Sequence, residues 1–252
     1  MVMIKKLGES ERVPFTEHLT ELRKRLMFSL GVVAVLFGLA YAVSDILLIP
    51  FSSLIDEKLV FLSPTEAFFV HLKIAFYTAL GLAVPVLLYQ FWAFIAPGLV
   101  KKEKKYSIRL IVASTIFFAA GAAFCYFAVL PYGIKFLLGY GGEALRPMMA
   151  VGYFVGFSLN LMLVFGVVFQ LPLVVIFIHT LELVTLDQLR DFRRYLIVLS
   201  FVGSAVITPP DIFTQVVLSL PLIVLYEMSL LTIRIYNRKK MPKGEDEKAT
   251  AR

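Results

Sequence analysis

Long apolar runs, separated by short polar segments, are the feature that most restricts how this chain can fold. A helix needs about 20 consecutive apolar residues to cross the hydrocarbon core of a bilayer. Windows of this kind lie near 24–43, 68–95, 108–129 and 151–178. Only 17% of the 252 residues are charged, against about 25% in soluble domains. We therefore expect an all-α membrane protein with several spans.

Two more apolar segments, 195–207 and 212–233, follow one another closely. Only TPPD (208–211) separates them, and its two prolines cannot continue a helix. Their apolar parts, about 13 and about 15 residues long, reach roughly 20–23 Å, short of the roughly 30 Å hydrocarbon core. The sequence thus predicts six transmembrane helices, with short spans 5 and 6. Beside this hairpin either the bilayer thins or polar groups are held within it.

Lysines and arginines are distributed very unevenly between the two sides of the predicted bundle. Of the 25 in the chain, 21 lie in segments on the side of the N-terminus, and the other side holds only Lys58, Lys73, Lys135 and Arg146. Because cytoplasmic loops carry the excess of basic residues, we expect both termini in the cytoplasm and the protein in the inner membrane. We expect one membrane domain over 1–235 and a disordered polar tail over 236–252.

The loop over 44–67 carries two local signals. The residues from Ser44 have apolar side chains at helical spacing, which predicts an interfacial helix that covers the outer end of the bundle. Ser63, Pro64 and Glu66 form a capping-box pattern with proline at the first helical position, so the second span begins there.

Metal or catalytic chemistry has little support in this sequence. Cys125 is the single cysteine, and His18, His71 and His179 lie on different segments without ligand-like spacing. The chain also lacks a phosphate-binding loop pattern. We expect no metal, no cofactor and no enzymatic activity.

Prolines and one amide interrupt the apolar spans. Pro85, Pro172 and Pro221 favour bent helices and a concave, glove-like bundle. Gln170 lies deep in the fourth span and needs hydrogen-bonding partners there. Either it faces an intramembrane polar cleft, or it forms an interhelical hydrogen bond worth about 1 kcal/mol. The residues leave both possibilities open.

Glu227 lies near the inner end of the sixth span. An ion pair with Arg193, Arg194 or Arg234 explains it better than a direct contact to a client protein, because these basic residues share its side of the membrane.

Two other carboxylates, Glu21 and Glu103, lie among basic residues of inner-surface segments. The segment 14–26 reads as an amphipathic helix that leads into the first span. Topology alone would tolerate neutral residues in place of both acids, and carboxylates bind arginine side chains strongly. A partner with clustered arginines could therefore dock here. For Glu21, a pair with Arg25 four residues later is the alternative.

Seven stretches, in order along nearly the whole chain, resemble the TatC family, the multi-spanning subunit of the twin-arginine protein translocase. They are HLTELRKRL (18–26), PVLLYQFWAFIAPGLVKKEKK (85–105), FAAGAAFCYFAVLP (118–131), FGVVFQLPL (165–173), LRDFRRY (189–195), TPPDIFTQ (208–215) and LPLIVLYE (220–227).

The resemblance implies a receptor for signal peptides with paired arginines on folded cargo, driven by the proton motive force. It also implies a scaffold for single-span partner subunits of the TatA and TatB type, with several copies of the chain in the receptor complex. It assigns signal-peptide binding to Glu21, Arg23, Leu26, Phe94 and Glu103. Partner contact falls on Thr208, Asp211 and Gln215.

Two positions depart from the family pattern. Gln170 stands where glutamate is usual, which weakens any mechanism that needs a proton carrier there, and Thr208 stands where serine is usual. A proton-coupled solute carrier, the main rival, would need a charged pair near mid-bilayer and inverted repeats. An inert scaffold or insertase would have no use for Glu21 and Glu103.

Overall fold

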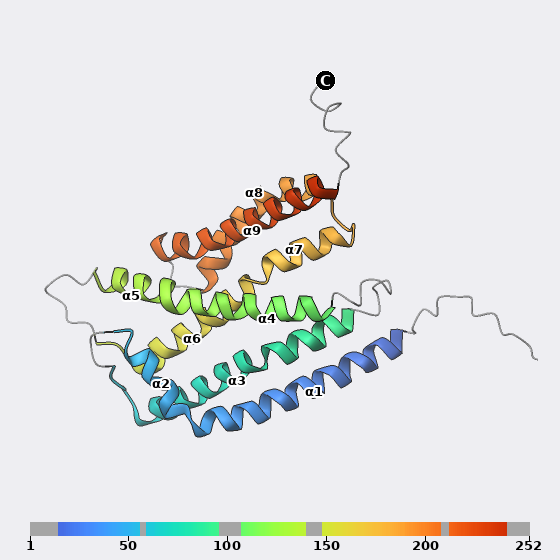
Figure 1. Cartoon of the computed structure of the whole chain (residues 1–252). Helices are drawn as coiled ribbons and strands as arrows, with labels where there is room; N and C mark the ends of the chain where they lie inside the picture. Colours follow the sequence, from blue (N-terminus) through green and yellow to red (C-terminus); the bar gives the residue numbers. More distant parts are fainter. Residues whose placement is uncertain (1–14, 56–58, 96–106, 140–147, 208–211, 241–252) are drawn as a thin grey trace, which may run out of the picture.

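The computed structural model describes residues 15–55, 59–95, 107–139, 148–207 and 212–240. Helices dominate this part of the chain, and a parallel β-bridge joins Val60 to Ala150. The elements are α1 (Phe15–Ala42), α2 (Ser44–Ser52), α3 (Pro64–Ile95), α4 (Ser107–Phe124), the π-helical turn η3 (Cys125–Val129), α5 (Leu130–Gly139), α6 (Val151–Val168), α7 (Leu171–Thr180), α8 (Leu186–Ile207) and α9 (Ile212–Lys240) (Figure 1). The predicted all-α membrane fold is confirmed.

Five helical stretches of the described chain are long and apolar enough to cross a membrane. They correspond to predicted spans 1, 2, 3, 4 and 6, and they are Leu19–Ala42, Pro64–Phe94, Ile108–Gly139, Val151–Thr180 and Gln215–Arg238. The remaining long helix, α8, begins among charged residues, and its apolar part matches the short fifth span predicted over 195–207.

Three helix boundaries differ from the sequence prediction. The third span continues through η3 to Gly139, and the N–H of Leu130 bonds the carbonyl five residues back, at Cys125, just before Pro131. The fourth span breaks at Phe169–Gln170, so that Pro172 lies in the first turn of α7, where a missing N–H is tolerated.

The end of α9 is the third difference. Residues 236–240, predicted as part of the tail, are helical, whereas 241–252 lie outside the described residues. Asn237 is held there by a 3.2 Å contact between its Nδ2 and His179 Nε2 of α7. Basic residues such as Arg238 also suit the negative end of the helix dipole.

The helices pack in a sequence from α1 at one edge to α8 at the other. α1 packs on α3, which packs on α4 and α6; α7 packs on α9, and α9 packs on α8 (Figure 1). The start of α1, the end of α3, the start of α8 and the end of α9 lie at one end of the bundle, at the right of Figure 1. We call this the basic end, because it carries Arg23, Arg25, Arg190, Arg193 and Arg234.

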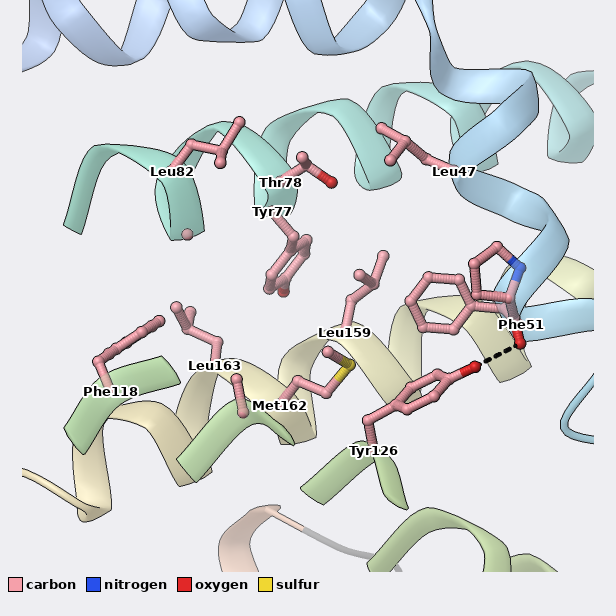
Figure 2. Close-up of a pocket in the computed structure, with 13 residues that line it drawn as sticks. Leu47, Phe51, Tyr77, Thr78, Leu82, Phe118, Tyr126, Leu159, Met162 and Leu163 are labelled. Atoms are coloured by element: carbon pink, nitrogen blue, oxygen red, sulfur yellow. Dashed lines mark hydrogen bonds between the residues drawn. The ribbon is translucent and has the colours of Figure 1, made fainter. Parts of the chain in front are cut away.

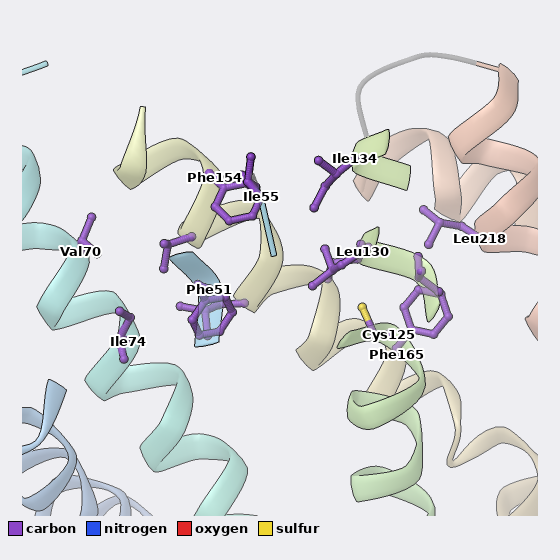
Figure 3. Packing of buried hydrophobic residues seen from close by; sticks show 14 residues of the cluster. Phe51, Ile55, Val70, Ile74, Cys125, Leu130, Ile134, Phe154, Phe165 and Leu218 are labelled. Atoms are coloured by element: carbon purple, nitrogen blue, oxygen red, sulfur yellow. The ribbon is translucent and has the colours of Figure 1, made fainter. Parts of the chain in front are cut away.

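Two apolar clusters form the core. The first joins α2, α3, η3, α5 and α6, and Leu218 of α9 reaches into it (Figure 3). Phe51 and Ile55 belong to this cluster, so the segment from Ser44 packs onto the bundle as predicted. The second cluster joins α7, α8 and α9 around Tyr226 and Leu230.

The opposite end of the bundle is tied together by Glu66. Its Oε2 accepts a hydrogen bond from the N–H of Leu62 at 2.7 Å, and its Oε1 accepts one from the N–H of Gly152 at 2.7 Å. Ser63 Oγ accepts from the N–H of Glu66 at 3.3 Å, which confirms helix capping at Ser63. The start of α3 is thereby fixed to the start of α6.

An apolar hollow of about 360 Å³ lies among α2, α3, α4, η3 and α6. Leu82 and Thr78 of α3 line one side, and Phe118 and Met162 line the other (Figure 2). Tyr126 closes it toward α2, where its hydroxyl donates to the carbonyl of Pro50 at 2.9 Å.

Candidate functional site

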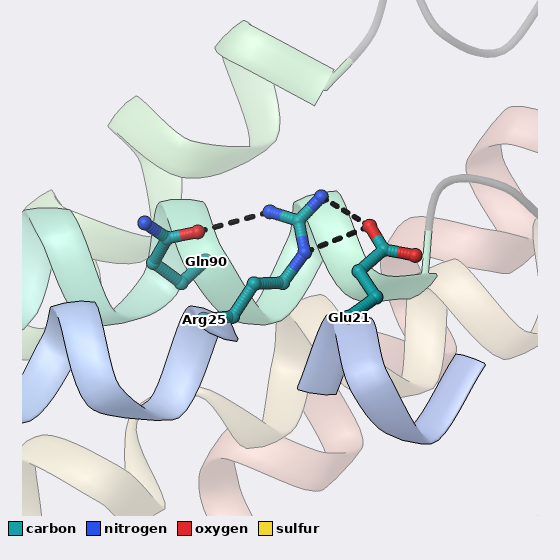
Figure 4. A network of polar contacts seen from close by, with 3 residues as sticks. All are labelled: Glu21, Arg25 and Gln90. Carbon is teal, nitrogen blue, oxygen red and sulfur yellow. Dashed lines mark hydrogen bonds and ion pairs between the residues drawn. The ribbon is translucent and has the colours of Figure 1, made fainter. Parts of the chain in front are cut away.

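At the basic end, one arginine connects α1 to α3. Arg25 donates to Glu21 Oε1 from Nε at 2.9 Å and from Nη2 at 2.6 Å, and its Nη1 donates to Gln90 Oε1 at 2.9 Å (Figure 4). Both bonds to Glu21 end on Oε1, so Oε2 takes no part in this pair. The side chain of Glu21 is 35% exposed, and that of Arg25 is 24% exposed. The structure therefore contains the alternative pair of Glu21 with Arg25, four residues later. The Glu21 carboxylate remains partly exposed to solvent.

Phe94 lies on α3, one helical turn after Gln90. It follows Gln90 by four residues, so both lie on the same face of the helix. Phe94 is half-buried. The structure thus brings the Glu21 face of α1 and the Phe94 face of α3 together through Arg25 and Gln90.

The other predicted signal-peptide residues lie elsewhere or outside the description. Arg23 and Leu26 are exposed, Leu26 at 64%, and they lie about 200° and 140° around α1 from Glu21. The α1–α3 interface therefore does not include them. Glu103 lies in 96–106, outside the described residues.

Gln170 is used to connect helices. Its Nε2 donates to the carbonyl of Ser114 on α4 at 2.8 Å. Ser114, which is 1% exposed, also accepts a 3.4 Å bond at its Oγ from Trp92 Nε1 of α3. The Trp92 ring packs edge-on against Phe177 of α7, with centroids 4.7 Å apart. Of the two possibilities left open for Gln170, the structure shows the interhelical hydrogen bond.

The α8–α9 hairpin satisfies its polar groups internally. Gln215 Nε2 donates to the carbonyl of Phe201 at 2.7 Å. Ser204 Oγ lies 2.9 Å from Ser219 Oγ, and Ser219 Oγ donates to the carbonyl of Gln215 at 2.7 Å. Thr208 and Asp211, the other predicted partner contacts, lie outside the described residues. The described part of the hairpin therefore pairs these polar groups within and between its two helices.

Glu227 forms the predicted ion pair at the basic end of the hairpin. Its Oε2 lies 2.7 Å from Arg193 Nη2, and both side chains are about half exposed. The neighbouring Tyr226 donates its hydroxyl to the carbonyl of Leu189 at 2.7 Å. Glu227 therefore joins α9 to α8, as expected of a structural ion pair.

The sequence analysis did not identify Gln90 and Ser114, which accept hydrogen bonds from Arg25 and Gln170. Polar side chains inside apolar spans are nevertheless a signal of interhelical contacts. Within the described ranges, no group of three or more His, Cys, Asp or Glu is placed to bind a metal ion.

The chain is similar in sequence to a known protein family and to individual members of it. Residues 17–221 match the family described as "Sec-independent protein translocase protein (TatC)". A TatC protein of Desulforapulum autotrophicum is 42% identical over 238 residues, covering 92% of this chain and 88% of that protein. One of Aquifex aeolicus is 41% identical over 235 residues, covering 90% and 98%.

Solved structures also superpose well on this chain. A crystal structure of the twin arginine translocase receptor TatC in the detergent DDM superposes with a TM-score of 0.80 at 38% identity, covering 86% of this chain and 99% of that chain. A second crystal structure of the twin arginine translocase receptor TatC gives a TM-score of 0.75 at 40% identity, covering 85% and 97%.

Proposed function

The chain belongs to the TatC family of Sec-independent protein translocase proteins, and on this premise we propose that it binds twin-arginine signal peptides of folded cargo at the cytoplasmic face. The observation that carries the proposal is the Glu21–Arg25–Gln90 contact (Figure 4), one helical turn before Phe94 on α3. It places a guanidinium-binding carboxylate and an aromatic side chain on adjoining helix faces at the basic end.

The contact favours arginine over lysine. A guanidinium presents several donors in one plane and binds a carboxylate through two of them, whereas an ammonium acts as a point charge. Glu21 already holds Arg25 in this way and keeps Oε2 for a second donor. We propose that an arginine of the signal peptide bonds Oε2 or takes the place of Arg25, and that Glu103 supplies the second carboxylate.

The apolar hollow supports the same function. A signal peptide carries an apolar region of about 7–15 residues, which spans roughly 10–22 Å as a helix. Leu82, on the wall of the hollow, lies twelve residues before Phe94, about 18 Å along α3. A peptide with its arginines at Glu21 therefore has the length to place apolar side chains in the hollow.

The membrane arrangement and partner site are also proposals. We propose that α8 crosses as a sixth, short span and that the basic end faces the cytoplasm, because basic residues gather there. The opposite end of the hairpin carries Val206 and Ile212, which are 82% and 83% exposed. We propose that single-span partner subunits dock on this surface, next to Thr208, Asp211 and Gln215, during proton-motive-force-driven export.

A binding measurement tests the receptor function. The full chain in lipid nanodiscs is titrated with a signal peptide that carries two arginines and with the same peptide carrying two lysines. We expect tighter binding of the arginine peptide by about tenfold or more, since hydrogen bonds to charged groups contribute about 1.5–3 kcal/mol. Equal affinities would remove the basis of the proposal.

A further inference from the structure

A groove between α8 and α9, at the basic end, is separate from the Glu21 site. It has a volume of about 360 Å³, and its lining includes Arg190, Arg193, Arg234 and Glu227. Three cationic side chains face one carboxylate, so the rim of the groove carries a net positive charge.

The ion pairs around the groove leave one arginine available. Arg193 bonds Glu227 at 2.7 Å, and Arg190 bonds Asp187 at 2.9 Å. Among the residues that the structure describes, Arg234 forms no ion pair, and it is exposed. The rim therefore suits an anion, with Arg234 as its main contact.

The wall of the groove is apolar and continues from Arg234 along α9. Val224, Met228 and Leu231 line it and are 48%, 57% and 58% exposed. Their spacing of four and three residues places them on one stripe, and Arg234 follows three residues after Leu231. The stripe thus leads from a cation at the end of the bundle into the membrane-spanning part of α9.

We propose that this groove binds an anionic phospholipid, with its phosphate on Arg234 and an acyl chain along Val224, Met228 and Leu231. Arg190, whose exposed pair with Asp187 uses Nη1, supplies a second contact to the phosphate. A basic pocket between transmembrane helices at the cytoplasmic side suits an anionic headgroup. A free phosphate would use the rim and leave the wall uncovered. A helix of a partner subunit would cover the wall, but it would match Arg234 only if an acidic side chain lay at the right position. A phospholipid satisfies both parts in one molecule.

Native mass spectrometry of the full chain in detergent tests the proposal, with palmitoyl-oleoyl phosphatidylglycerol, the matching phosphatidylcholine and glycerol 3-phosphate as probes. We expect phosphatidylglycerol to bind more tightly than phosphatidylcholine and glycerol 3-phosphate to bind negligibly. Arg234→Gln and Arg190→Gln should each weaken phosphatidylglycerol binding about fivefold, the contribution of one basic residue at a membrane surface.

Arg194→Gln is the matched control, because it removes the same charge from α8, four residues after Arg190. The Arg194 guanidinium lies over the ring of Tyr195, 4.9 Å from its centroid, and Arg194 does not line the groove. This variant should change the affinity less than twofold. Equal binding of the two lipids, or an equal loss in Arg194→Gln, would overturn the proposal. Loss of a co-purifying single-span subunit in Arg234→Gln, without any lipid preference, would assign the groove to that subunit instead.

The lipid result is independent of signal-peptide binding, since neither probe nor variant touches Glu21 or Phe94. Folding of each variant is checked through Cys125, which is fully buried and is the single cysteine of the chain. A thiol-reactive dye should label it only after unfolding, at the same temperature in all variants without lipid. Phosphatidylglycerol should raise that temperature in the parent chain and in Arg194→Gln more than in Arg234→Gln.

Discussion

Arg25 holds the carboxylate of Glu21 with two hydrogen bonds, at 2.9 Å and 2.6 Å, while its third bond reaches Gln90 on α3. One side chain thus fixes the orientation of the acid and joins the first two long helices at the basic end. A guanidinium already occupies one oxygen of this carboxylate, and Oε2 takes no part in the pair. A structural pair and a receptor site are therefore compatible at the same residue.

Glu21→Gln separates these two roles. A partly exposed i,i+4 ion pair contributes little to stability, so unfolding in an SDS titration, followed by labelling of Cys125, should change by less than about 1 kcal/mol. Binding of a twin-arginine signal peptide should fall about tenfold, because the charge that recognises the guanidinium is lost.

Glu227→Gln serves as the control for that variant, since it breaks another Glu–Arg pair at the same end of the bundle. It should leave peptide binding unchanged. A large loss of stability in Glu21→Gln, with peptide binding intact, would show that Glu21 is structural only.

Leu82→Trp tests the apolar hollow. The larger side chain should occupy space in the hollow and weaken signal-peptide binding several-fold while the fold persists, because Leu82 is 61% exposed. Leu39→Trp is the matched control: Leu39 is 62% exposed on α1 and does not line the hollow. Peptide titrations compare the two variants, and an equal effect would exclude the hollow as the site of the apolar region.

Gly121→Ala tests the close approach of α4 and α6. A Cβ at Gly121 would lie 2.5 Å from the backbone oxygen of Phe165, which cannot move without shifting α6. We expect destabilisation of about 1–3 kcal/mol. Gly38→Ala, with nothing within 4 Å of its Cβ, should be neutral or more stable by up to about 1 kcal/mol. The SDS titration measures both, and equal stabilities would contradict this packing.

Gln170→Met tests the connection between Gln170 and Ser114. Methionine keeps the length of the side chain but cannot donate to the Ser114 carbonyl, 2.8 Å away. We expect a loss of about 1 kcal/mol in unfolding free energy and unchanged peptide binding. If signal-peptide binding is lost at unchanged stability, Gln170 faces the peptide rather than holding α4.

Much of the fold could be predicted because hydrophobic length and charge distribution are properties of single segments. Five of the six predicted spans, the cap at Ser63 and the Glu227 ion pair all follow from residues and their spacing. The continuation of the third span to Gly139 could not be predicted in this way, because the π-helical turn η3 depends on how the helix accommodates Pro131.

The site was predictable only in part, for a related reason. From the sequence, Glu21 could pair either with Arg25 or with an arginine of a binding partner. Only the packing of α1 on α3 shows that Arg25 also donates to Gln90. The role of Ser114 depends on Trp92 and Gln170, which are distant in sequence and meet only when α3, α4 and α7 pack together. Pairings of this kind are not encoded in any one segment.

Photocrosslinking from position 94 tests the central claim most directly. A benzoylphenylalanine replaces Phe94 in the full chain, and inner-membrane vesicles are illuminated with a twin-arginine signal peptide or its twin-lysine counterpart. The account predicts a strong crosslink to the arginine peptide, a several-fold weaker one to the lysine peptide, and loss of the difference in Glu21→Gln. The absence of any crosslink from position 94, or equal crosslinking of both peptides, would contradict it.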